Sequence, residues 1–270
     1  MRIRLQSIAW VTLLTWLALP QLAQAHRQWL VPSSTQLNGQ DQWVIVDAAV
    51  SENLFDFDSR ALDLDGLTIT SPRGQKVAPQ NQFSGQLRST FDFKLDQQGT
   101  YKVSVVDHAE MVSYKLNGEM HRWRGNASEA GFKIPAQATD VERMAIENRL
   151  ETFVSLGEPT VVPQQLEGDG LELQPITATT SLYAKDTSRF RLFLDGKPAA
   201  NMKVSVVPGG VRYRGVLNEM LVSTNAGGEF EVTWPQAGMY WLHASYPPRE
   251  PGKRPVRMVS YSATFEVLPY

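Results

Sequence analysis

The chain has 270 residues, a formal net charge of −2 and no cysteine. A slightly acidic chain does not favour nucleic acid or anionic lipid as a partner. Without cysteine, disulfides, thiol catalysis and thiolate metal sites are excluded, so stability has to come from packed hydrophobic cores.

The first 25 residues have the features of a cleaved secretory signal. Two arginines precede an apolar run at residues 8–19, and Ala23-Gln24-Ala25 has the small-x-small pattern of a signal peptidase site. The run is too short for a membrane span, and no later stretch reaches the ~20 apolar residues that a span needs. We expect a periplasmic protein that begins at His26, with an uncleaved N-terminal anchor as the less favoured alternative. The signal carries two of the 26 basic residues and no acidic one, so the remaining chain has a net charge of −4.

Short alternating segments predict β-strands through residues 26–157. Residues 91–95 alternate strictly, which places two phenylalanines and a leucine on one face. Asn117-Gly118 separates residues 112–116 from residues 119–123, a pattern typical of a hairpin with a tight primed turn. These features predict a β-sandwich as the first module.

Residues 140–156 are predicted to form a short helix. Thr139 or Asp140 could cap it, Glu142 lies in its first turn, and Gly157 ends it. Its apolar residues partly follow helical spacing. We expect this helix to lie across the first sandwich or to join two modules.

A Pro- and Gly-rich segment, residues 158–170, marks the expected boundary between two modules. Beyond it, short alternating strands with turns every eight to twelve residues predict a second β-sandwich over residues 171–270. The basic, Pro-rich stretch 249–257 is interpreted as a solvated hairpin loop. The sequence therefore predicts an all-β protein of two tandem sandwiches with one short helix.

The first mature residue is the main candidate for chemistry. Cleavage after Ala25 would leave His26 with a free α-amine, and this amine and the imidazole Nδ1 can close a chelate ring around one metal ion. The α-amine has a pKa near ~7.7–8.0 and the imidazole near ~6.5, so both lose their protons at modest cost near neutral pH. Nitrogen donors of this kind suit Ni, Co, Cu or Zn rather than Mg or Ca.

Further ligands have to come from the other histidines or from carboxylates. His108 and His121 lie in the same module as His26 and are the candidates for the remaining metal-binding nitrogens. A lone histidine on a strand is more often a hydrogen-bonded bystander, which is our interpretation of His243. The acidic residues near the first module's loops are interpreted mainly as solvated side chains: Asp47, Glu52, Asp56 and Asp58.

No motif for enzymatic hydrolysis is present. The sequence has no Gly-x-Ser-x-Gly, no His-Glu-x-x-His and no glycine-rich phosphate loop between a strand and a helix. A copper oxidase with its metal at an N-terminal histidine would need a second histidine placed to complete a T-shaped set of nitrogens. We therefore expect a protein that is not an enzyme.

Several segments of the mature chain are similar to those of a known family: residues 25–32, 54–58, 62–67, 170–175, 195–199 and 224–230. Through them the chain resembles, over most of its length, a periplasmic family of unknown function whose better-described relatives are NikK-type accessory proteins of nickel and cobalt uptake. The resemblance implies an Ig-like or carboxypeptidase-regulatory-like C-terminal module. It also implies that the metal is held through the mature N-terminal histidine, His26.

Two functions follow from these observations. The favoured one is a periplasmic transition-metal-binding protein that assists metal uptake or delivery, with a metal transporter of the inner or outer membrane as its partner. The alternative is a protein- or glycan-binding β-sandwich without metal, whose surface would use aromatic side chains such as Trp29, Trp123, Tyr213 and Trp241.

Overall fold

The computed structural model describes residues 26–125, 132–161, 166–248 and 255–270. In these residues the chain is almost entirely β, and its one helix is the four-residue α1 (Val211–Arg214). The expected all-β class is confirmed. No helix in the described ranges is long and apolar enough to cross a membrane. The expected signal peptide, residues 1–25, and parts of segments 158–170 and 249–257 lie outside the described residues.

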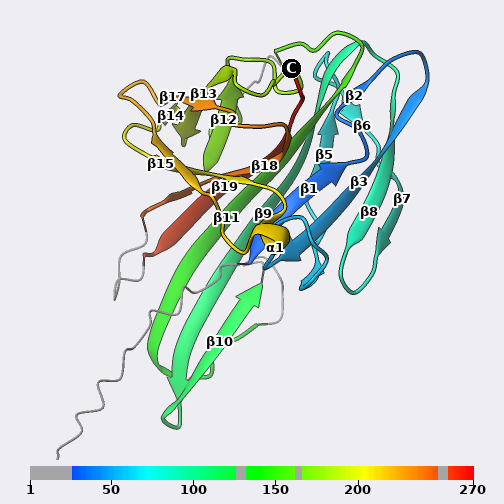
Figure 1. Cartoon of the computed structure of the whole chain (residues 1–270). Helices are drawn as coiled ribbons and strands as arrows, with labels where there is room; N and C mark the ends of the chain where they lie inside the picture. Colours follow the sequence, from blue (N-terminus) through cyan, green and yellow to red (C-terminus); the bar gives the residue numbers. More distant parts are fainter. Residues whose placement is uncertain (1–25, 126–131, 162–165, 249–254) are drawn as a thin grey trace, which may run out of the picture.

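Sheet A is built from the first third of the chain (Figure 1). Its order is β1-β3-β8-β7, and β4 pairs with β3. The strands are β1 (Arg27–Pro32), β3 (Gln42–Ser51), β4 (Arg60–Ala61), β7 (Gln80–Ser84) and β8 (Ser89–Leu95). In β8, buried and half-exposed residues alternate strictly along the whole strand, which confirms the alternation predicted there.

Sheet B has ten strands and runs through both halves of the chain. Its order is β16-β15-β18-β19-β11-β9-β5-β6, with β10 beside β9 and β2 beside β11. The strands are β2 (Gln36–Leu37), β5 (Leu67–Thr70), β6 (Lys76–Val77), β9 (Gly99–Leu116), β10 (Glu119–Gly125), β11 (Thr139–Leu156), β15 (Lys203–Pro208), β16 (Met220–Ser223), β18 (Gly238–Tyr246) and β19 (Arg257–Val267). Because β11 pairs in parallel with β19 and antiparallel with β9, it joins the two halves.

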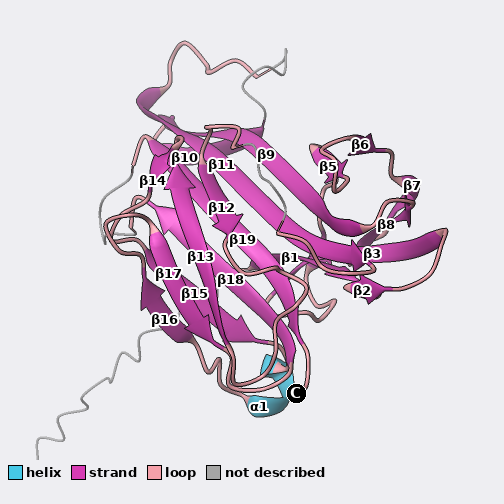
Figure 2. Cartoon of the chain, turned by 90° about the horizontal axis from the view of Figure 1, so that it is seen from above, coloured by secondary structure: helices cyan, strands magenta, loops and turns pink. Residues whose placement is uncertain are grey.

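Sheets A and C cover different halves of sheet B, on opposite faces (Figure 2). Sheet C contains β12 (Leu171–Pro175), β13 (Thr187–Leu194), β14 (Lys197–Pro198) and β17 (Glu229–Thr233). In β11, Leu150 and Val154 enter the core beneath sheet A, whereas Phe153 enters the core beneath sheet C. The chain thus has two cores that share one strand, and the domain boundary expected at residues 158–170 stays a prediction.

The helix expected at residues 140–156 is wrong, because this segment forms most of β11. Eight consecutive residues, 149–156, are buried there. When both faces of a strand are covered, apolar residues no longer alternate, so the period that reveals a strand is lost. The helix-like spacing that remained was overridden by pairing with β9 and β19.

The hairpin expected at Asn117-Gly118 is confirmed as the turn between β9 and β10. Both turn residues have positive φ angles, 52° and 85°, as a type I′ turn requires. The ends of β9 and β11, together with β10, extend beyond the two cores as a projecting ribbon (Figure 1). We call this part, residues 106–125 with residues 139–149, the ribbon.

A third, smaller cluster packs β1 onto the C-terminal half of the chain. We call it the junction cluster, and its buried members are Trp29, Ala49, Leu54, Val207, Val211 and Trp241. It links sheet A to β15, β18 and α1, which are far away in the sequence. The first residues of β1 are therefore held against both halves of the protein.

Candidate functional site

The pairing of β1 with β3 places His26 beside Glu52. Arg27 is paired with Ser51 in the antiparallel ladder, so the next residues outward, His26 and Glu52, are cross-strand neighbours. His26 Nε2 lies 3.6 Å from Glu52 Oε1, and each side chain is 53% exposed. A metal ion that binds an imidazole nitrogen and a carboxylate oxygen at ~2.1 Å each, with tetrahedral geometry, separates those atoms by roughly 3.4 Å. The pair therefore has suitable spacing for one cation.

Aromatic and backbone contacts fix the start of β1. Trp241 Nε1 donates a hydrogen bond to the Gln28 carbonyl at 2.9 Å, and Trp29 Nε1 donates to Ser51 Oγ at 2.9 Å. The Arg27 guanidinium lies 5.7 Å from the centre of the Trp241 ring and donates to the Glu52 carbonyl at 3.1 Å. Burial lowers the pKa of Arg27, although nearby Glu219 partly opposes this shift. These contacts hold the three residues that follow His26.

The other three carboxylates named from the sequence have different partners. Asp58 accepts hydrogen bonds from the backbone N–H groups of Glu52 and Asn53, both at 2.9 Å. Burial alone would raise the pKa of Asp58, but these hydrogen bonds outweigh it and lower the pKa. Asp56 lies 3.9 Å from Arg212, and Asp47 lies 3.4 Å from Arg88. Of the four, Glu52 is the one beside His26.

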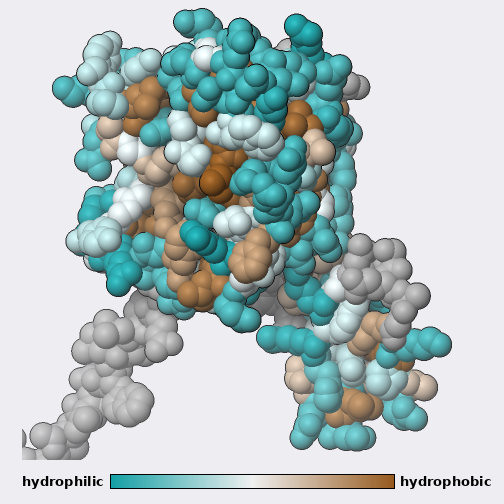
Figure 3. Space-filling model, turned by 90° about the vertical axis from the view of Figure 1, so that its right-hand side faces the viewer, coloured by the Kyte–Doolittle hydropathy of each residue, from teal (hydrophilic) through white to brown (hydrophobic). Residues whose placement is uncertain are grey.

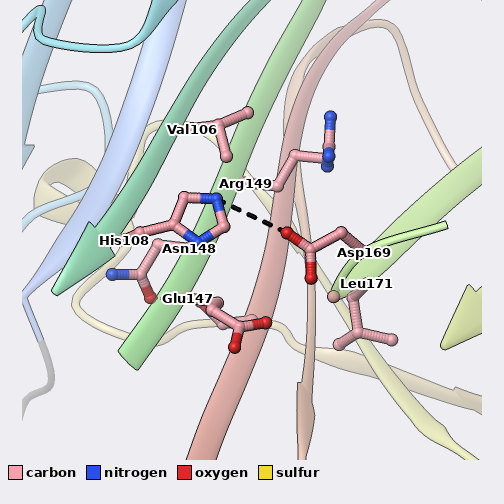
Figure 4. Close-up of a pocket in the computed structure, with 9 residues that line it drawn as sticks. Val106, His108, Glu147, Asn148, Arg149, Asp169 and Leu171 are labelled. Carbon is pink, nitrogen blue, oxygen red and sulfur yellow. Dashed lines mark hydrogen bonds and ion pairs between the residues drawn. The ribbon is translucent and has the colours of Figure 1, made fainter. Parts of the chain in front are cut away.

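His108 lies in a small pocket between β9, β11, β19 and the segment before β12 (Figure 4). Its Nε2 is 3.7 Å from Asp169 Oδ2. The neighbouring acids are held by Arg257, whose guanidinium nitrogens lie 2.7 Å from both Glu147 and Asp195. Hydrogen bonding to Arg257 is the largest cause that lowers the pKa of Asp195. A metal ion here would have to displace an arginine, so the pocket is better described as an ion-pair network.

His121 lies elsewhere, on the ribbon. It is directly opposite Tyr114 on β9, and the two rings stack with centroids 5.3 Å apart. Tyr114 is six residues beyond His108 on the same strand, which separates the two histidines by about 20 Å.

Among the described residues, no group of three or more His, Asp or Glu side chains could hold a metal. The ligand set expected from the sequence, His26 with His108 and His121, is therefore not assembled there. His243 stacks on Trp241 and has its Nδ1 3.0 Å from Ser262 Oγ, in agreement with a hydrogen-bonded bystander.

A family model described as "Domain of unknown function (DUF4198)" matches residues 23–247. The chain belongs to the DUF4198 family. The match includes His26, Glu52 and every strand of sheet B except β19. No curated protein matches this DUF4198 chain significantly.

Solved structures resemble the DUF4198 chain only distantly. The D0–D1 domain of intimin is 12% identical, with 87% of this chain and 96% of that chain covered and a TM-score of 0.21. A DUF4785 family protein from Legionella pneumophila is 9% identical, with coverage of 80% and 50% and a TM-score of 0.24. A Salmonella α2-macroglobulin is 15% identical, with coverage of 87% and 14% and a TM-score of 0.21. Scores this low carry no argument about function.

Proposed function

We propose that this DUF4198 protein is a periplasmic metal-binding protein that assists the uptake or delivery of a divalent transition metal through His26. The observation that carries the proposal is the 3.6 Å separation between the His26 ring and the Glu52 carboxylate. Cleavage after Ala25 would add the free α-amine as a third donor. The chelate uses Nδ1 rather than Nε2, so the half-exposed ring and the Glu52 side chain have to reorient for all three donors to meet one ion.

The chemistry of this donor set fits a transition metal. Two nitrogens and one carboxylate oxygen suit Ni, Co, Cu or Zn, whereas Mg and Ca prefer oxygen donors throughout. Three protein donors leave at least one position for water or for a donor from a partner. Such an open site fits transfer of the ion to a membrane transporter, as the resemblance to NikK-type accessory proteins also suggests.

The decisive measurement is metal titration of the mature protein, with its N-terminus verified by mass spectrometry. We expect one Ni, Co, Cu or Zn ion per chain. One glycine added before His26 should weaken binding at least about tenfold, or about 1.4 kcal/mol, because it removes the α-amine from the chelate. Glu52→Gln should also weaken binding, whereas Glu119→Gln, at an exposed position of the ribbon, should not. Equal affinity of the extended protein, or no metal uptake, would contradict the proposal.

A second candidate function, protein or glycan binding, is favoured by the outer face of sheet A. Trp43 and Ile45 on β3 are 47% and 51% exposed, and Phe83 on β7 is 65% exposed. Figure 3 shows apolar side chains gathered near the middle of the molecule's sheet A side. In contrast, Trp29 and Trp241 are buried and serve packing, so they do not form the aromatic surface expected from the sequence.

If this surface binds a ligand, the wild-type protein should capture a protein from periplasmic extract, or bind a glycan on an array, in the presence of a chelator. Trp43→Ala and Phe83→Ala should each abolish that binding. Tyr270→Ala, at an exposed aromatic residue outside this surface, is the matched control and should retain binding. Recovery that is unaffected by the sheet A variants would reject this second function.

A further inference from the structure

Three methionines lie on neighbouring strands of sheet B, two of them on the ribbon and the third beside it on β19. Met111 on β9 is directly opposite Met144 on β11. Met258 on β19 is opposite Ile146, so it is the diagonal neighbour of Met144. Directly opposite residues have Cβ atoms ~4.5–5.5 Å apart and diagonal ones ~7–8 Å, both within reach of long side chains. Met144 on the central strand β11 is therefore within side-chain reach of Met111 on one side and of Met258 on the other.

The strand register places all three methionines on the same face of sheet B. β9 and β11 remain in register from Met111 to Val105, where Val105 and Leu150 enter the core beneath sheet A. Side chains alternate with a period of two, so Met111 and Met144 share the face of these core residues.

Hydrogen bonds along the adjacent row confirm this face. Ser260 donates to Asn148 at 2.7 Å, Asn148 donates to Asp107 at 3.3 Å, and Arg124 also donates to Asp107. These four side chains come from β19, β11, β9 and β10 and therefore lie on one face. Met258 is two residues before Ser260, so it belongs to this face as well.

The surroundings of the methionines favour a soft cation over a hard one. Each methionine is half-buried, and the residues between them, Ala109 and Ile146, are nearly buried and apolar. The carboxylate in the adjacent row, Asp107, is already bound by Arg124 and Asn148. Arg124 is directly opposite Met111, but its guanidinium is paired with Asp107, so the uncharged donors next to Ala109 and Ile146 are the three thioethers.

We propose that Met111, Met144 and Met258 form a binding site for Cu(I). Thioether sulfur is a soft, uncharged donor that selects Cu(I) over the divalent ions that amine and imidazole nitrogens prefer. The site shares no donor with His26 and Glu52, so it goes beyond the proposed function and does not depend on it. The metal binds in its existing oxidation state, and no redox step is involved.

The test is titration of the mature protein with Ag(I), which has the same preference for sulfur without redox chemistry, and with Cu(I) under anaerobic conditions against a competing chelator. We expect one ion per chain. Met111→Leu and Met144→Leu should each weaken binding at least tenfold, and the double variant should abolish it. Met120→Leu is the matched control, because Met120 lies on the same ribbon but pairs with Lys115, four residues from Met111.

A second measurement uses the wild-type protein, so its result does not depend on whether the variants fold. Isotope-labelled methionine methyl groups should show Ag(I)-induced shifts at Met111, Met144 and Met258, while Met120 and Met220 remain unchanged. No binding, binding retained in the double variant, or equal loss in Met120→Leu would overturn the proposal and would leave these methionines as packing residues. The protein extended before His26 should bind Ag(I) normally, and the double variant should still bind Ni(II), so the two sites can fail separately.

Discussion

Replacing Trp29 by alanine is expected to lower the free energy of unfolding by about 3–5 kcal/mol. Trp29 is 1% exposed and lies in the junction cluster. Its ring centroid is 5.7 Å from that of Phe55 and 5.3 Å from that of Phe57. Removal of the indole would leave a cavity and would deprive the buried Ser51 hydroxyl of its donor, Trp29 Nε1.

Urea denaturation of the wild type and variants measures this effect. Trp29→Phe should cost less, because it keeps one aromatic ring in the cluster. Trp43→Ala removes an indole of the same size from the exposed face of sheet A and should change stability little. If Trp29→Ala and Trp43→Ala had the same small effect, the junction cluster would not hold β1 against the second half of the chain.

Local sequence signals were sufficient for much of the fold. The alternation in residues 91–95 and the Asn117-Gly118 turn depend on neighbours in the sequence, and both predictions are confirmed. Asp195-Gly196 likewise forms a tight turn between β13 and β14, with positive φ at both residues. Turn chemistry and period-two alternation act over a few residues, so one sequence can reveal them.

Long-range pairing was not visible in the sequence. β11 pairs in parallel with β19, more than a hundred residues away, and this contact converts an expected helix into the strand shared by both cores. No local pattern specifies such a partner. The same contact makes sheet B continuous across the two halves of the chain.

The candidate site also has one residue that local sequence reveals and one that depends on long-range strand pairing. His26 could be selected because the sequence places it directly after an expected cleavage site. The sequence does not distinguish Glu52 from the other acids of the first module's loops, because only the β1–β3 register brings it beside His26. His108 and His121 are close in the sequence, but they lie far apart because His121 pairs with Tyr114, six residues beyond His108 along β9.

The second large effect on stability is expected at Glu151, a buried carboxylate at the centre of sheet B that is 1% exposed. Tyr261 donates to it at 2.7 Å and Ser104 at 3.0 Å. Lys102 Nζ lies 3.5 Å and Arg149 Nη1 3.8 Å from its Oε1. Burial, followed by the Glu151 charge, holds the pKa of Tyr261 well above its usual value, so the phenol remains a donor.

Glu151→Gln is expected to lower the free energy of unfolding by about 3–5 kcal/mol, because it removes the buried counter-charge of two cations. Arg149 retains Glu167, at 2.8 Å, as a partner. Burial alone would lower the pKa of Arg149, but Glu167, Glu151 and Glu172 together outweigh burial and raise it. Lys102 Nζ, 3.5 Å from Glu151 Oε1, loses the same counter-charge.

A double-mutant cycle separates loss of the charge pair from loss of packing. Glu151→Leu should be strongly destabilising, whereas Arg149→Met combined with Glu151→Leu should cost less than the sum of the two single changes. Glu167 is more than half exposed, so water can replace Arg149 as its partner in the double variant. Strict additivity in urea denaturation would show that the Arg149–Glu151 charges do not stabilise each other. In that case the polar centre of sheet B would depend on the hydrogen bonds from Tyr261 and Ser104.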